Sequence, residues 1–248
     1  MTNILTGTSG FSYSDWKDGI FYPKGLPRKK WLEYYASVFN TVELNVTFYR
    51  LPKKETFQDW HRRTPDNFLF TLKASRYITH IKRLKNCQKA LGNFLENALF
   101  LKNKLGVILW QLPPSMRIDT KTLESFCDLL FNSDAKKIKH VFEFRHPSWL
   151  YESVYEILEK YNYCLCIAHS NQWPNEEIST ADYLYLRFHG GESLYSSDYS
   201  DKELKGWARK VKKWISGKRE VFSYFNNDAK GYAPRNALIF RKLLEKAK

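Results

Sequence analysis

Charged side chains stand at alternating positions in several β-rich segments of this sequence. In 183–189, Arg187 and His189 share one parity with two tyrosines, while leucine and phenylalanine take the other. In two earlier β-rich segments, Glu43 and Glu143 likewise alternate with apolar side chains. Successive side chains of a strand point to opposite faces, so the charged groups lie on one face and the apolar groups on the other. Arginine, histidine and carboxylate groups in one place can bind an anion and transfer protons.

In each segment, the face with the charged side chains extends to the carboxyl-terminal end. Lys73 and Arg145 stand at this end in two of the segments. Charges inside a protein are costly unless they are paired or used in binding or catalysis. Two interpretations follow. One is an internal ion-pair network in which Glu43 and Glu143 neutralise Arg145 and Arg187. The other is a functional site formed by the same side chains.

The balance of charge at this place favours an anionic ligand. Two carboxylates face one lysine and two arginines, and His189 can add a further positive charge. A divalent metal ion needs surplus carboxylate or neutral imidazole, because nearby cations repel it. Phosphate or carboxylate needs the reverse, and arginine offers a bidentate fork. We therefore expect an anion site and assign no metal ligands, while Glu43, Glu143 and His189 or His146 keep a metal-dependent alternative open.

β-rich and amphipathic segments alternate along the chain, which explains how these side chains come together. The β-rich segments are 4–9, 41–45, 68–74, 105–111, 140–145, 163–168, 183–189 and 221–226. Helical patterns cover 28–39, 84–102, 121–131, 148–161, 202–215 and 236–246. Such alternation predicts an α/β fold, a single (β/α)8 TIM-type barrel that spans 1–248 as one domain, with its site at the carboxyl-terminal mouth. A doubly wound sheet is the alternative, but GTSGFS after the first segment lacks the GxGxxG loop.

Composition narrows the class of protein. The chain has 248 residues, of which 43% are hydrophobic and 27% charged, and its net charge is +14. A basic surface attracts anionic small molecules or nucleic acid phosphate. Without an apolar run of 18 residues or a secretory pattern at the start, we expect no membrane association. The four cysteines lack CxxC spacing, which suits a reducing cytoplasm, and we expect a cytoplasmic protein.

Motifs spread over the whole chain resemble one known family. They are GTSGFSYSDW at 7–16, FNTVELNVTFYRLP at 39–52, ITH at 78–80, QLPPS at 111–115, EFRHPSW at 143–149, RFHG at 187–190 and YFNNDAKGYAPRNA at 224–237. As a set they resemble the YecE-like family, domain of unknown function 72. The resemblance implies a single TIM-type barrel, in agreement with the count of segments, and it implies no particular reaction.

We expect an enzyme that acts on a phosphorylated or other anionic substrate. Glu43 and Glu143 are the predicted general acid and base, and His189 is the predicted proton-transfer partner. The predicted substrate-binding residues, named from the charge pattern and from the family motifs, are Ser9, Asn45, Lys73, Thr79, His80, Gln111, Arg145, His146, Arg187, Asn226 and Asn227. These residues point to no particular cofactor, and they leave the oligomeric state open.

A nucleic-acid-binding barrel, either a nuclease-like enzyme or a non-catalytic binder, is the alternative function. Basic residues of the first half could contact phosphates, and Trp16 or Tyr77 could stack on bases. The basic residues are Arg28, Lys29, Lys30, Arg62, Arg63, Lys82, Arg83 and Lys85. Binding of this kind weakens steeply with salt, because it releases counterions from the nucleic acid.

Overall fold

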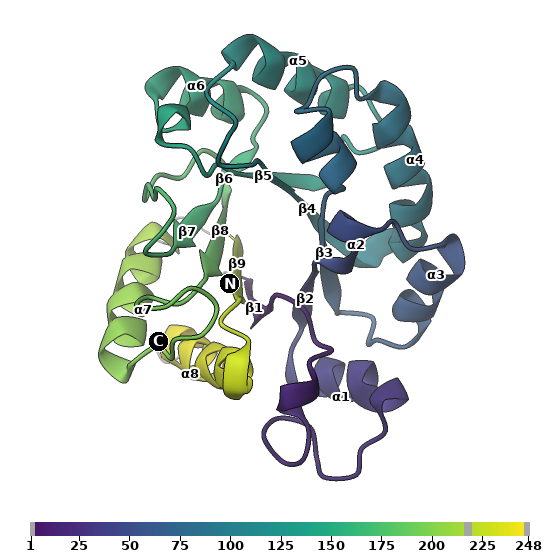
Figure 1. The fold of residues 1–248 in the computed structure, drawn as a ribbon, viewed down its shortest axis with the longest axis vertical. Helices are drawn as coiled ribbons and strands as arrows, with labels where there is room; N and C mark the ends of the chain where they lie inside the picture. The colour runs from purple at the N-terminus through teal and green to yellow at the C-terminus, as the bar shows by residue number, and fades with distance from the viewer. Residues whose placement is uncertain (1–2, 216–219, 246–248) are drawn as a thin grey trace.

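A ring of parallel strands forms the centre of the molecule, and helices surround it (Figure 1). The computed structural model describes residues 3–215 and 220–245. Its strands are β1 (Ile4–Thr8), β2 (Thr41–Leu44), β3 (Leu69–Lys73), β4 (Leu105–Gln111), β5 (Lys139–Glu143), β6 (Cys164–Leu165), β7 (Ile167–His169), β8 (Tyr183–Phe188) and β9 (Glu220–Phe225). All the paired strands run parallel, in the orders β1-β9-β8-β7 and β2-β3-β4-β5-β6.

Two junctions join these strand groups into a barrel with eight strand positions. β6 and β7 are separated by Cys166 alone, whose amide donates to Phe142 O at 2.8 Å, so they occupy one position between β5 and β8. β1 and β2 meet at their carboxyl-terminal ends through a bridge between Ser9 and Glu43. The barrel that the segment pattern predicts is therefore confirmed as an α/β fold of parallel strands.

A tyrosine hydroxyl completes the junction between β1 and β2. Tyr35 Oη accepts from Thr8 N at 2.9 Å and donates to Thr41 O at 3.1 Å, so it stands in for a missing backbone bond between the strands. The two backbones approach so closely here that a Cβ on Gly7 would lie 2.2 Å from Thr41 O. Glycine is required at this position because no side chain fits.

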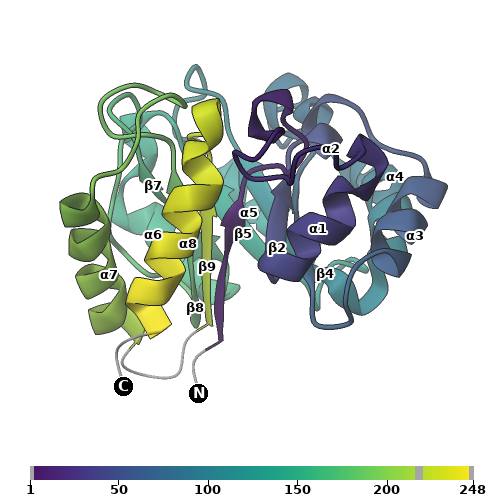
Figure 2. The same ribbon diagram turned by 90° about the horizontal axis from the view of Figure 1, so that it is seen from below.

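Helices cover the outside of the barrel, and the start of β1 lies beside the end of α8 at the bottom of Figure 2. They are α1 (Trp31–Val38), α2 (Val46–Tyr49), α3 (Lys54–Arg62), α4 (Gln88–Ala98), α5 (Thr120–Phe131), α6 (Glu152–Lys160), α7 (Asp201–Ile215) and α8 (Tyr232–Glu245). A π-helical turn, Tyr77–Ile81, follows β3, and short 3-10 turns cover Ser14–Trp16, Arg28–Lys30, Leu99–Lys104, Pro147–Trp149 and Ala229–Gly231. α2 and α3 lie in a stretch where the sequence indicated no helix, because α2 is a single turn and α3 is a short, mostly polar helix that buries only Phe57.

Apolar side chains pack in two layers, one inside the barrel and one between the strands and the helices. The parity of a residue along its strand decides which layer it joins. Leu184, Leu186 and Phe188 belong to the large cluster between strands and helices. Tyr183 and Tyr185 belong to the smaller cluster inside the barrel, together with valine, leucine and phenylalanine from other strands. The parity predicted for this strand is therefore confirmed, and the charged ends of the same faces lie above a packed lumen.

Candidate functional site

A cavity of about 470 Å³ opens where the strands end, at the carboxyl-terminal mouth of the barrel. Seven of its lining residues are among the predicted site residues, namely Asn45, Lys73, His80, Gln111, Arg145, Arg187 and Asn226. The others are Tyr13, Phe48, Tyr49, Pro114, Tyr195 and Asp228. Except for His80, which lies in the π-helical turn after β3, the first group comes from strand ends and the residues just after them, and the loops that follow the strands provide most of the second.

An arginine held between two carboxylates forms the floor of this cavity. Arg187 donates from Nε and Nη2 to the two oxygens of Glu43, at 3.0 and 2.7 Å, and from Nη1 to Glu143 at 2.5 Å. Ser9 Oγ and Tyr185 Oη fill the remaining positions on Glu43, at 2.6 and 2.5 Å. Arg187 is only 1% exposed, and both glutamates are fully buried. The ion-pair network considered from the sequence is therefore present, and Arg187 has little left to offer a ligand.

Both glutamates are held in their ionised form. Burial by itself raises the pKa of Glu43. The charge of Arg187 and the hydrogen bonds that Glu43 accepts outweigh burial, so the pKa of Glu43 is lowered. For Glu143 the same balance between burial and the charges of Arg187 and Arg145 holds the pKa well below its usual value. A carboxylate stabilised in this way is a poor general acid at neutral pH.

Lys73, at the end of β3, is buried in the cavity wall and has no carboxylate within 4 Å in the described part of the chain. Its Nζ lies 4.2 Å from the centre of the Phe48 ring. Burial, and then the charge of Arg187, lower the pKa of Lys73 to about 7. This side chain therefore exchanges its proton within the physiological pH range, unlike an exposed lysine.

Arg145 lies beside the floor and keeps one side of its guanidinium group for other partners. Its Nε donates to Glu143 Oε1 at 2.9 Å, and the ring of Trp173 stacks on the guanidinium at 4.4 Å. Across the described residues its Nη atoms make no further bond. Arg145 lines the cavity, so these donors are available to a ligand there.

His189 is a neutral, fully buried histidine beneath the cavity. Asn226 Nδ2 lies 3.1 Å from its Nδ1, and Glu143 Oε1 lies 3.5 Å from its Nε2. Burial, and then the charge of Arg187, lower the pKa of His189 to about 4. With Asn226 donating to Nδ1, the ring proton sits on Nε2 and faces Glu143. The ring connects Asn226 to the floor, and Asn226 itself reaches the cavity.

His80 lies in the π-helical turn after β3 and lines the cavity from there. Thr79 Oγ1 lies 2.9 Å from its Nδ1 and fixes the ring, and Phe48 packs against the ring edge. Burial, and then the charge of Lys73, lower the pKa of His80 to about 4. His80 is therefore a neutral hydrogen-bonding group at physiological pH, and Thr79 acts by positioning it.

Asn45, Gln111 and Asp228 bring further polar groups to the cavity. The buried Oδ1 of Asn45 has no hydrogen-bond partner in the described segments, whereas Gln111 Nε2 donates to Leu112 O at 2.7 Å. Asp228 was not among the predicted residues. Burial, and then the charge of Asp15, raise the pKa of Asp228 to about 6. It follows the last strand in the motif YFNNDAKG, and its acidic side chain beside two asparagines was the signal that could have identified it.

Glu43, Glu143 and His189 lie beneath the cavity, and four of the predicted substrate-binding residues also lie outside its wall. Ser9 is bonded to Glu43 beneath the floor, and Thr79 stands behind His80. His146 accepts from Ser148 N at 3.1 Å and so caps a short 3-10 helix. Asn227 Nδ2 donates to Ser197 O and to Asn236 Oδ1, which ties two loops together. These four side chains bond to neighbouring groups and do not line the cavity, and their assignment to substrate binding stays a prediction.

The donor set for a metal ion is not assembled. Within residues 3–215 and 220–245, no three histidine, cysteine, aspartate or glutamate side chains form a group that could hold a metal. Glu43 and Glu143 are occupied by Arg187, and His146 is turned to its helix cap. All four cysteines lie among the described residues, where they are buried and form no disulfide.

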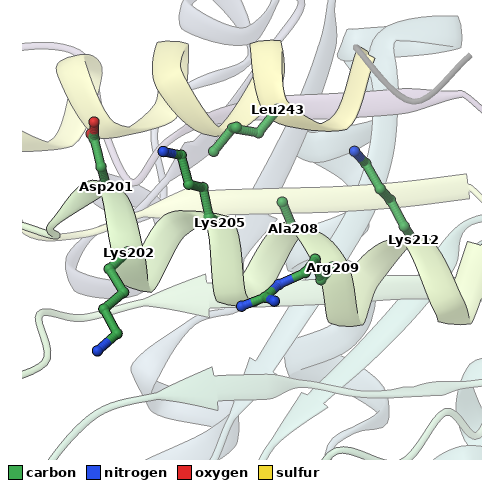
Figure 3. A pocket seen from close by; sticks show the side chains of 7 residues that line it. All are labelled: Asp201, Lys202, Lys205, Ala208, Arg209, Lys212 and Leu243. Carbon is green, nitrogen blue, oxygen red and sulfur yellow. The ribbon is translucent and has the colours of Figure 1, made fainter.

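A second hollow of about 710 Å³ lies on the outer surface between α7 and α8 (Figure 3). One leucine comes from α8, and the rest of the lining belongs to α7: Asp201, Lys202, Lys205, Ala208, Arg209 and Lys212. Its charged groups are surface side chains of a single helix, and none of the predicted site residues reaches it. Buried polar groups from several strands converge at the barrel mouth instead, which makes the mouth the candidate site.

Several basic residues proposed for nucleic acid contact pair with acidic neighbours. Arg63 lies 2.9 Å from Glu33 and 2.8 Å from Asp59, and Lys85 lies 3.2 Å from Asp119. These pairs reduce the number of free cations on the surface of the first half. None of the helices in the described ranges combines the length and the apolar character needed to cross a membrane.

Fold and site together define the class of protein: a TIM-type barrel whose mouth holds a buried Arg–Glu network below a cavity lined with cations. A family model described as "Protein of unknown function DUF72" matches residues 5–248. The chain belongs to the DUF72 family, which confirms the resemblance carried by the motifs.

Known relatives support both the family and the fold. A DUF72 family protein of Thermotoga maritima has a crystal structure that is 33% identical, with a TM-score of 0.85 over 98% of this chain and 100% of that one. UPF0759 protein YecE of Escherichia coli K12 is 33% identical over 136 residues, which cover 50% of this chain and 48% of that protein. A xylose isomerase domain containing protein of Salmonella typhimurium is 11% identical with a TM-score of 0.59, covers 99% of this chain and 98% of its own, and shows the fold alone.

Proposed function

We propose that this protein is an enzyme that acts on a phosphorylated or otherwise anionic small molecule held at the barrel mouth. One observation carries the proposal: Arg145 and Lys73 line the cavity with cationic donors that no side chain of the described residues occupies. Glu43 and Glu143 cancel the charges of Arg187 and Arg145, to which they are bonded. Protonated Lys73 has no carboxylate within 4 Å among the described residues, so an anionic ligand in the cavity would pair with its charge.

The donors suit a phosphate or carboxylate group. Arg145 presents its Nη atoms as a planar fork, and Lys73 adds a point charge. Trp173 and Glu143 hold the guanidinium of Arg145 on two sides, so little side-chain entropy is lost when a ligand binds. Asn45 also lines the cavity, where its side-chain amide suits a hydroxyl or amine elsewhere on the same ligand.

Two cavity groups have pKa values close to neutrality and so suit proton transfer. Burial lowers the pKa of Lys73 to about 7 and raises the pKa of Asp228 to about 6. A group that works as a general acid or base at physiological pH needs a pKa in this range. The sequence-based assignment of Glu43, Glu143 and His189 to proton transfer stays a prediction, and their burial and bonding favour a role in holding Arg187.

Binding of inorganic phosphate, measured by isothermal titration calorimetry at constant ionic strength, tests the proposal. We expect Arg145→Gln and Lys73→Met each to weaken binding by about tenfold or more, since a charge-assisted bond contributes about 1.5–3 kcal/mol. Lys54→Met, an exposed lysine on α3, is the matched control and should bind as the wild type does. Equal affinity in all four proteins would overturn the proposal.

Proton uptake provides a second readout of the same site. A bound anion stabilises the charged form of Lys73, so its pKa rises above about 7 when phosphate binds. Near pH 7.5 the binding heat should therefore depend on the ionisation enthalpy of the buffer, and it should lose that dependence in Lys73→Met. The nucleic-acid alternative predicts instead that a single-stranded oligonucleotide binds with a steep loss of affinity between about 50 and 200 mM salt.

A further inference from the structure

We propose that Lys73 is a nucleophile that forms an imine with its substrate, and that the substrate is an aldehyde or ketone carrying an anionic group. This inference rests on the proposed function, which supplies the anionic group of the substrate, and it adds a carbonyl group to that substrate. It names the class of compound that the cavity would take and the atom, Lys73 Nζ, to which that compound would be joined.

A comparison of two buried lysines separates a reactive amine from a structural cation. Lys104, which is 2% exposed, donates to His61 O and Thr64 O, both at 2.7 Å, and lies 3.9 Å from Asp66. Lys73, which is 9% exposed, has no such acceptors from the described residues and faces the Phe48 ring instead. The structure satisfies the ammonium of Lys104, but it leaves the amine of Lys73 open to the cavity.

The surroundings of Lys73 favour a neutral and therefore nucleophilic amine. Burial removes the water that would stabilise an ammonium, and the charge of Arg187 also lowers the pKa of Lys73, while the charge of Glu143 opposes it in part. Thr47 Oγ1 donates to Lys73 O at 2.6 Å and fixes the backbone from which the side chain extends. A lysine made nucleophilic by desolvation and a neighbouring cation is a known arrangement for attack on carbonyl carbon.

The covalent step balances with groups that line the cavity. Neutral Nζ attacks the carbonyl carbon, the C–N bond forms, and the carbonyl π electrons move to oxygen. One amine proton then passes to that oxygen, which gives a carbinolamine. The protonated carboxyl of Asp228, whose pKa is raised to about 6, gives its proton to the hydroxyl. Water leaves, and a protonated imine and the Asp228 carboxylate remain.

The charge of the product explains why the substrate should also be an anion. A protonated imine keeps a positive charge on Lys73 Nζ, which has no carboxylate within 4 Å among the described residues. A phosphate or carboxylate on the substrate, held by Arg145, would offset that charge and stabilise the imine. An uncharged aldehyde lacks this compensation, so the two kinds of carbonyl compound should behave differently at Lys73.

Reductive trapping tests the proposal directly. The wild-type protein is treated at pH 7 with limiting glyoxylate, an anionic aldehyde, or with acetaldehyde, its uncharged match, and with cyanoborohydride, whose hydride reduces the imine carbon to leave a secondary amine. Peptide mapping by mass spectrometry then measures the labelling rate of each lysine. We expect Lys73 to react with glyoxylate at least tenfold faster than Lys104 and the exposed Lys54, and several-fold faster than with acetaldehyde. Inorganic phosphate should protect Lys73 alone.

Two variants separate the imine from the anion site. Arg145→Gln should remove the preference of Lys73 for glyoxylate over acetaldehyde, whereas exposed Lys54 should react with both aldehydes as it does in the wild type. Asp228→Asn should slow labelling of Lys73 by both aldehydes to a similar degree. If Lys73 reacts no faster than Lys54 although phosphate still binds, the imine is refuted and the proposed function stands. If Lys73 reacts quickly with both aldehydes alike and phosphate neither binds nor protects, the anion site is refuted, and with it the substrate class named here.

Discussion

Replacing Arg187 with methionine tests the buried network under the cavity most severely. Arg187 makes two bonds to Glu43, at 3.0 and 2.7 Å, and a third to Glu143. In Arg187→Met, Glu143 keeps Arg145 at 2.9 Å, but Glu43 keeps only the hydroxyl donors of Ser9 and Tyr185. One fully buried carboxylate is then left without a cation, and it takes up a proton instead of remaining charged.

The expected loss of stability follows from the cost of that proton. An unperturbed glutamate has a pKa of about 4.3, and each pH unit above it costs about 1.36 kcal/mol for protonation. The free energy of unfolding should therefore fall by about 4 kcal/mol at pH 7 and by about 1 kcal/mol at pH 5, relative to the wild type at the same pH. The sign is fixed because the pKa of Glu43 in the folded variant lies above its unfolded value, so stability is lost as pH rises.

Urea unfolding, followed by tryptophan fluorescence and circular dichroism at both pH values, measures this difference. Arg187→Met with Glu43→Gln is the matched control, since the amide removes the need for a proton. The double variant should regain most of the lost stability at pH 7 and show the same deficit at both pH values. A deficit of Arg187→Met that is below about 1 kcal/mol at pH 7, or equal at pH 5 and pH 7, would refute the reasoning.

Three further predictions concern other buried groups. The Lys73 side chain should titrate near pH 7 in a heteronuclear NMR experiment, because burial and Arg187 lower its pKa to about 7, and a titration near pH 10 would contradict this. Tyr35→Phe should cost about 1–3 kcal/mol in urea unfolding, since Thr8 N and Thr41 O lose their shared partner, and an unchanged midpoint would show that the hydroxyl is not needed. Burial lowers the pKa of His140 and of His189 to about 4 in the folded state, against about 6.5 unfolded, so each should contribute a loss of about 3 kcal/mol as the pH falls from 6.5 to 4. A free energy of unfolding that stays flat over this range would contradict the assignment.

Strand parity was sufficient to place the charged residues of the floor. Glu43, Glu143 and Arg187 belong to strands, and alternation along a strand leaves a side chain only two faces to choose between. Their gathering at the mouth followed from the barrel, because parallel strands end on the same side. The sequence did not predict which cation pairs with which carboxylate. That pairing depends on distances across the barrel, which no local pattern contains.

Which loop side chains reach the cavity could not be predicted in full, and the reason is physical. Asp228 and Tyr195 reach the cavity through backbone turns, including positive φ values at Tyr195 and Lys230, and such turns carry no period in the sequence. His146 follows Arg145 in the same motif, yet the chain turns into a 3-10 helix there and the imidazole becomes its cap. Neighbours in a motif can therefore have unrelated places in the structure.

A crystal structure of the protein grown with phosphate at neutral pH is the most direct test of the central claim. We predict that a phosphate occupies the barrel mouth between Lys73 Nζ and the Nη atoms of Arg145, above the Arg187 network. Phosphate found only on exposed basic side chains, such as those along α7 in Figure 3, with none at the mouth, would contradict the account.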